Sequence, residues 1–486
     1  RSLNKIFPSA QVSADITPEY MGLGYIVGPR IAGTLVAGSV LSWLVVQPLL
    51  ASLVNPLTIA AQEIKLGYLK DIHTAGGPGS WDPVTQTFAD PASALYRAYI
   101  RLIGAGAVAM GGLITLIKTI PTIVSSFKES IGAVKDKGTG SRLRTEKDLS
   151  LKVVLFGSLG LVVLIGCLSI IPGENFFSRL IIGVLILVFG AFFVTVASRI
   201  VGLIGSSNSP VSGMTIATIM GTCLIFLAVG WSGKAYEAMA LVVGGMVCIA
   251  ASNAGGTSQD LKTGFLVGAT PKYQQLALFV GVIVSALAVG FTIKILDLPD
   301  ADMIKKGIQH SIGFKYPAPQ ATLMATLIEG IQGGKLDWNF VLVGVFLAVV
   351  VELCGVRALS FAIGVYLPLS TTLPIFIGGM IRGFADTLKK KKGIIGREGE
   401  EDLERGNLFA TGLVAGGALM GVIFAFLGVN GNIGNFLKKL SLEDSLKGVL
   451  SQNGYFLLGI ACFAVMGFIM YRVAVSREKS QSPDAP

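Results

Sequence analysis

Long apolar segments recur along the whole chain and decide what it can fold into. An α-helix of roughly 20 predominantly apolar residues spans the hydrocarbon core of a bilayer. These segments are continuous and do not alternate with polar residues, which argues against a strand-built barrel. They therefore predict an all-α polytopic membrane protein. The segments lie at about 24–54, 93–120, 149–171, 178–204, 211–231, 236–252, 273–296, 338–356, 358–385, 406–429 and 453–471.

The composition supports a membrane protein. Charged residues make up 14% of the chain, whereas a soluble domain usually carries about 25%. Hydrophobic residues make up 52%, and the mean hydropathy is +0.70. The net charge of +10 comes from basic residues in short loops between apolar segments. This is the positive-inside pattern of membrane proteins, so a nucleic-acid partner is not indicated.

Motifs for enzymatic chemistry are missing from the sequence. It contains no GxxxxGK[ST] loop, no HExxH and no GxSxG, so familiar nucleotide hydrolysis, metalloprotease and serine-hydrolase sites are not indicated. The five cysteines fall inside apolar segments without a CxxC pair, which predicts neither disulfides nor a zinc site. We expect no enzyme, no metal site and no cofactor. An ion gradient, a partner or passive flow must then drive any transport.

Loop charges orient the predicted spans in a single membrane domain covering residues 1–486. Basic residues concentrate in loops 121–148 and 386–405 and in the tail 472–486, which predicts that all three are cytoplasmic. The protein is then expected in the cytoplasmic (inner) membrane, with several passes. The connections expected on the outer side are 55–92, 297–337 and 430–452.

The segment 358–385 conflicts with this orientation if it crosses the membrane once. Arg357 and Arg382 flank it, and both ends have a cytoplasmic character. Pro368 and Pro374 remove backbone donors and interrupt a helix, and hydroxyls between them can satisfy the freed carbonyls. We therefore expect ten spans and one re-entrant or broken-helix hairpin. The alternative is a kinked span with a further crossing near 318–332.

Two other polar segments lie among the apolar ones. Residues 206–214 place Asn208 and Pro210 among serines before an apolar run, much as in the 358–385 segment. Paired interrupted segments indicate a transporter binding site, although proline and glycine are common in membrane helices. Residues 252–264 are glycine-rich and polar, and we expect non-helical backbone there, lining a cavity.

Five charged positions are candidates for chemistry within the membrane. Asp260 is the first choice for an ion or proton relay with Lys262 as its partner, and the alternative is that both are solvated in a loop. Glu352 is the second choice, and pairing with Arg357 five residues later is its alternative. Arg97 and Arg101 lie one turn apart; they hold a substrate carboxylate or extend to the headgroups.

Three blocks of sequence resemble the oligopeptide transporter (OPT) family, closest to its prokaryotic and yellow-stripe-like branch. They are Ser207–Met214, Asn253–Gln275 and Val365–Gly379, and the likeness extends over about residues 20–471. The resemblance implies a bundle of about sixteen helices, proton-coupled symport, and peptides or metal–chelator complexes as substrates. Because this chain has fewer segments and begins with Arg1, we expect that N-terminal helices are missing.

The resemblance also marks positions for the substrate or ion pathway, without giving their individual roles. We expect proton-coupled symport of small oligopeptides, with metal–chelate symport, a passive channel or a membrane-embedded enzyme as alternatives. The expected partners are the substrate, protons and lipid; the oligomeric state is unknown. With Glu352 added from its own context, the candidates are Asn208, Pro210, Asn253, Gln259, Asp260, Lys262, Glu352, Tyr366, Thr371 and Thr372.

Overall fold

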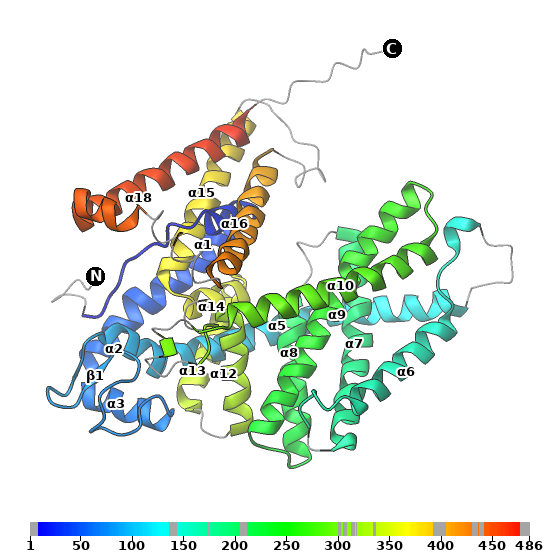
Figure 1. Cartoon of the computed structure of the whole chain (residues 1–486), viewed down its shortest axis with the longest axis horizontal. Coiled ribbons are helices and arrows are strands. Elements are labelled where there is room, and N and C mark those ends of the chain that lie inside the picture. Colours follow the sequence, from blue (N-terminus) through cyan, green and yellow to red (C-terminus); the bar gives the residue numbers. More distant parts are fainter. Residues whose placement is uncertain are drawn as a thin grey trace. The chain divides into compact units, whose positions relative to one another are not determined.

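The computed structural model is almost wholly helical (Figure 1). It describes residues 8–135, 143–173, 175–204, 211–299, 303–304, 309–312, 316, 318–333, 337–391, 405–429, 436 and 442–476. Eight of the helices in these ranges are long and apolar enough to cross a membrane, and two shorter apolar helices join them. The predicted all-α polytopic membrane fold is thereby confirmed.

The chain divides into two compact units, each assembled from distant stretches of sequence. Unit 1 comprises residues 1–101, 292–312 and 355–486, and unit 2 comprises residues 102–291 and 313–354. The elements of unit 1 are α1 (Pro18–Val40), the π-helix η1 (Leu41–Val46), α2 (Gln47–Leu53), α3 (Pro56–Lys65), β1 (Trp81–Asp82), β2 (Thr87–Phe88), α4 (Pro91–Leu95), the π-helix η2 (Tyr96–Ile100), α14 (Ala358–Tyr366), α15 (Leu369–Lys391), α16 (Arg405–Val429) and α18 (Glu443–Val475).

Unit 2 is built on the pair α7 and α9, with α6, α8 and α12 packed beside them. One of its buried clusters joins Ile182, Phe226 and Val243, from α7, α8 and α9. The elements that lie wholly or mostly in this unit are α5 (Arg101–Lys135), the 3-10 helix η3 (Arg144–Glu146), α6 (Leu151–Cys167), α7 (Phe176–Ile204), α8 (Val211–Ala228), α9 (Lys234–Leu266), α10 (Pro271–Leu296), α12 (Pro319–Gly333) and α13 (Trp338–Leu353).

Helix α9 corrects the expectation of irregular backbone at residues 252–264. The helix runs without interruption through this polar segment to Leu266. Gly255 lies against α7, where an added Cβ would be 2.8 Å from Val201 Cγ2. Glycine costs about 1 kcal/mol in a helix relative to alanine. Here it permits close contact with a neighbouring helix, so the polar composition does not break the helix.

Helix α1 is broken within its length, a feature that the sequence analysis did not predict. Gly28 has φ +82° and ψ 170°, outside the helical region, and Pro29 follows it. Pro29 has no N–H to donate to the carbonyl of Tyr25, four residues earlier. Residues 18–27 and 29–40 are therefore two helical segments that join at a kink.

Helices α14 and α15 form the predicted helical hairpin. Arg357 and Ser360, at the start of α14, line a small cavity with Arg30 and Thr34 of α1. The chain turns at Leu367 and Pro368, and α15 then runs back along the same part of α1. Farther along α15 the contact is Gly383, where an added Cβ would lie 3.5 Å from Pro29. Arg357 at the start of α14 and Gly383 of α15 thus both lie near residues 29–34.

Candidate functional site

The turn of the α14–α15 hairpin is held by side chains that replace the missing backbone bonds. Pro368 has no N–H for the carbonyl of Gly364, and Ser39 Oγ donates to that oxygen at 2.8 Å. Thr372 Oγ1 in turn donates to Ser39 Oγ at 2.8 Å, and both side chains are fully buried. The hydroxyl that satisfies the freed carbonyl thus comes from Ser39 of α1, and Thr372, which lies between the two prolines, supports Ser39 instead of binding the carbonyl itself.

Two aromatic side chains complete the support of this turn. Tyr96 Oη donates to the carbonyl of Tyr366 at 2.9 Å, and Trp43 Nε1 donates to the carbonyl of Leu367 at 3.2 Å. Their rings stack on each other, with centroids 5.3 Å apart. Trp43 lies in η1 and Tyr96 in η2. π-helical turns are rare in proteins overall, but they often occur at functional sites. Here each of the two π-helices places a hydrogen-bond donor at the hairpin turn.

An arginine–tyrosine cluster lies next to the turn. Arg101 is only 7% exposed, and its Nη1 donates to Tyr68 Oη at 2.8 Å. The buried Tyr366 side chain also shares a hydrogen bond with Arg101. Arg101 therefore does not extend to a headgroup region. Arg97, one turn earlier in η2, is exposed.

Glu63 in α3 is the most unusual charged group of unit 1. Its side chain is 0% exposed, and neither carboxylate oxygen has a hydrogen-bond partner among the described residues. Burial raises the pKa of Glu63 to about 7, against the lowering effect of the nearby Arg97. The sequence gives no signal for Glu63, because this residue lies in a connection that was expected to be an outer loop.

The buried carboxyl predicts a pH-dependent stability. Below its ordinary pKa of 4.5, Glu63 is protonated in both the folded and the unfolded chain. As the pH rises from 4.5 to about 7, the unfolded chain releases the proton first, so the free energy of unfolding falls, by about 3 kcal/mol in total. Melting temperatures in detergent should show this fall in the wild type and a smaller one in Glu63→Gln. Equal pH profiles would contradict it.

The predicted candidates of unit 2 are not gathered around a buried charge. Asn253, Gln259, Asp260 and Lys262 all lie exposed on α9. Lys262 lines an open groove of about 510 Å³ together with Arg199 of α7, Asp148 and others. Gln274 Nε2 donates to the backbone carbonyl of Asp260 at 3.1 Å. Its lining combines the charged side chains of Asp148, Arg199 and Lys262 with apolar residues such as Leu261 and Phe265.

Glu352 has a partner other than the expected one. Its carboxylate forms an ion pair with Lys118 of α5, and its side chain is 20% exposed. The sequence did not suggest this pair, because the two residues lie more than 200 positions apart. Thr371 lies half-buried at the start of α15. Asn208 and Pro210 lie outside the described residues.

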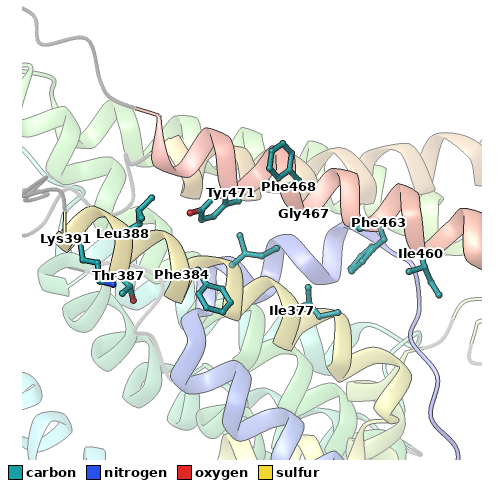
Figure 2. A pocket seen from close by; sticks show the side chains of 12 residues that line it. Ile377, Phe384, Thr387, Leu388, Lys391, Ile460, Phe463, Gly467, Phe468 and Tyr471 are labelled. Carbon is teal, nitrogen blue, oxygen red and sulfur yellow. The ribbon is translucent and has the colours of Figure 1, made fainter.

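A groove between α15 and α18 is mainly apolar (Figure 2). It measures about 750 Å³ and is lined by side chains such as Phe384, Phe463 and Phe468. Thr387, Lys391 and Tyr471 are the polar exceptions in its lining. An apolar surface of this kind suits hydrocarbon better than a charged solute. The hairpin turn with its arginines and Glu63 is therefore the stronger candidate site in unit 1.

Comparison with known proteins gives three findings. A family model described as "OPT oligopeptide transporter protein" matches residues 4–428. A "Putative oligopeptide transporter" of Haemophilus influenzae is 30% identical over 377 residues, which cover 70% of this chain and 58% of that protein. A "Probable metal-nicotianamine transporter YSL14" of Oryza sativa subsp. japonica is 22% identical over 395 residues, which cover 75% of this chain and 48% of that protein.

The chain spans between about half and three-fifths of the length of these two relatives. No solved structure matches it.

Proposed function

Because the chain belongs to the oligopeptide transporter family, we propose that it carries small peptides across the membrane by symport with protons. The observation that supports this most is the pair of broken helical elements packed together in unit 1. One is α1, broken at Gly28, and the other is the α14–α15 hairpin with its turn at Leu367. Interrupted helices of this kind form the binding sites of many secondary transporters.

The charged groups beside the hairpin turn suit a peptide and a proton. The exposed Arg97 has a guanidinium that can bind the C-terminal carboxylate of a peptide through two parallel hydrogen bonds. Glu63 is a buried carboxyl that can exist in a protonated form near neutral pH. The sequence has no nucleotide-binding loop, so an ion gradient is the energy source we propose.

The remaining candidates keep the roles that the sequence assigned to them, as proposals. Asp260 and Lys262, with Asn253 and Gln259, are pathway candidates on α9, and Glu352 is another through its pair with Lys118. Tyr366, Thr371 and Thr372 line the hairpin turn, and Asn208 and Pro210 belong to the same family motifs. We place the protein in the cytoplasmic membrane, with the basic segments 121–148, 386–405 and 472–486 on the cytoplasmic side.

Symport of metal–chelator complexes is the second candidate function. It is favoured by the name of the rice relative, a probable metal-nicotianamine transporter. Both substrate classes carry carboxylates that Arg97 can bind, so the residues at the hairpin turn do not separate them. An uptake experiment in which peptides and metal chelates compete would distinguish the two substrate classes.

The test of the proposal is uptake by the full-length protein in proteoliposomes. A pool of labelled di- to tetrapeptides and a set of iron chelates are offered separately, with and without an inward proton gradient. We expect the peptides to accumulate only with the gradient, and a protonophore to abolish the accumulation. Accumulation of the chelates alone would select the second candidate. Uptake that neither saturates nor depends on the gradient would indicate a channel and contradict symport.

A further inference from the structure

The carboxyl group of Glu63 is enclosed and fully buried, and no described residue donates a hydrogen bond to either of its oxygens. The loop after α3 closes over it: an added Cβ at Gly77 would lie 3.1 Å from Glu63 Oε2. The backbone of Glu63 is fixed, because its carbonyl accepts from the N–H of Tyr68 at 2.8 Å and of Leu69 at 3.3 Å. The carboxyl therefore cannot turn out to water without a rearrangement of this loop.

Few charges face this carboxyl from the surrounding elements. Helix α3 packs against η2, α4 and β2. The residues of α4 (Pro91–Leu95) and of β2 (Thr87–Phe88) contain no titratable group. From η2, Arg97 lowers the pKa of Glu63, and the hydroxyl of Tyr96 is engaged at the carbonyl of Tyr366. The hydroxyl of Tyr68 accepts from Arg101. Arg97 is thus the charge that controls the protonation of Glu63.

A buried acid without donors favours its neutral form. Isolated ionised carboxylates are too costly to bury, so such groups take up a proton. A proton needs no cavity, unlike any other cation that a carboxylate binds. The position also suits exchange with the outside, because Glu63 lies in the connection 55–92, outside the membrane-spanning helices.

We propose that Glu63 binds the proton that drives transport, and that Arg97 couples this proton to the substrate. The proposal rests on the symport function argued above. When a substrate carboxylate binds to the exposed Arg97, the guanidinium is neutralised and no longer favours the ionised form of Glu63. Glu63 then takes up a proton. By linkage, a proton on Glu63 in turn frees Arg97 for the substrate, so the two bind together.

The test compares three variants of the full-length protein in proteoliposomes. Glu63→Gln mimics the protonated acid, and we expect gradient-driven accumulation of peptide to fall by about tenfold or more, within the usual range of coupling between two sites. Exchange of labelled for unlabelled peptide without a gradient should persist. Asp71→Asn is the matched control, because this acid lies half-buried in the same connection and its carboxylate already accepts a hydrogen bond from Thr74 Oγ1; it should accumulate peptide normally. Asp260→Asn tests the carboxylate that the sequence analysis ranked first.

A second measurement does not depend on transport by a variant. Infrared difference spectra of the wild type should contain a carboxylic-acid band that titrates near pH 7, as the pKa of Glu63 requires. The band should be missing in Glu63→Gln. Peptide, or the substitution Arg97→Gln, should shift its titration to higher pH.

The outcomes separate this inference from the proposed function. If the wild type depends on the gradient and Glu63→Gln accumulates peptide equally well, the inference is wrong and the symport function stands. A band that titrates in the ordinary range of glutamate also overturns the inference. If the wild type accumulates nothing under a gradient, both proposals fail.

Discussion

Replacing Gly24 by alanine should prevent stable packing of unit 1. An added Cβ at this position would lie 1.8 Å from the backbone oxygen of Ile375. The contact is reciprocal, because a Cβ at Gly378 would lie 2.0 Å from the oxygen of Met21. Both obstacles are backbone atoms, so no rotamer change can relieve them. Overpacking costs about 1–3 kcal/mol when side chains adjust, and we expect a loss at or above the upper end.

Gly33→Ala is the matched control for this prediction. Gly33 belongs to the same helix, and the nearest atom to its added Cβ is Phe376 Cε2 at 4.0 Å. Its effect should be near zero or stabilising, since alanine favours a helix by about 1 kcal/mol over glycine. Melting temperature and the folded fraction in size-exclusion chromatography measure both variants. Equal stability of the two would show that α1 and α15 do not cross at Gly24.

The α14–α15 hairpin was predictable because two local signals agree. Basic residues at both ends conflict with a single crossing, and Pro368 supplies the break. The tertiary partners of the turn were not predictable: Ser39, Trp43 and Tyr96 lie hundreds of residues away in sequence. Their roles depend on the π-helical turns and on the path of α1, which no local pattern specifies.

The break in α1 and the burial of Glu63 were missed for a common reason. The dipeptide Gly28–Pro29 was visible, but proline and glycine are frequent in membrane helices and often leave them continuous. Likewise, a glutamate in a connection is normally solvated. In both cases the outcome depends on a distant segment. Arg382 supports the broken end of α1, and the loop at Gly77 encloses Glu63.

The opposite error occurred at residues 252–264, where a polar composition suggested irregular backbone. Gly, Ser, Thr, Asn and Asp make up most of this segment and are poor helix formers, but α7 packs closely against Gly255. Packing against a neighbouring helix therefore overrides local propensity there. Asp260 is consequently an exposed residue of a regular helix, whereas the enclosed acid of the described structure is Glu63.

Arg382→Met should destabilise unit 1 by removing the group that caps the broken end of α1. Arg382 Nη1 donates to the carbonyl of Ile26 at 2.8 Å and to that of Tyr25 at 3.4 Å. Pro29 cannot donate to Tyr25, and the kink at Gly28 removes the regular helical donor to Ile26. Methionine retains much of the apolar stem but leaves both carbonyls without this donor. A buried polar group without a partner costs about 1–3 kcal/mol, and we expect about 3 kcal/mol for the two.

Two further variants, Arg382→Lys and Asp386→Asn, distinguish the hydrogen bonds that cap α1 from the ion pair between Arg382 and Asp386. Arg382→Lys retains a charged donor that reaches one carbonyl, so it should recover part of the lost melting temperature. Asp386→Asn removes the partner of Arg382 Nε, 3.7 Å away. Because the Asp386 side chain is 41% exposed, that ion pair contributes little, at most about 1 kcal/mol. If Asp386→Asn were as damaging as Arg382→Met, the ion pair and not the cap would hold α1. If Arg382→Met matched the wild type, the broken end of α1 would have to find its donors elsewhere.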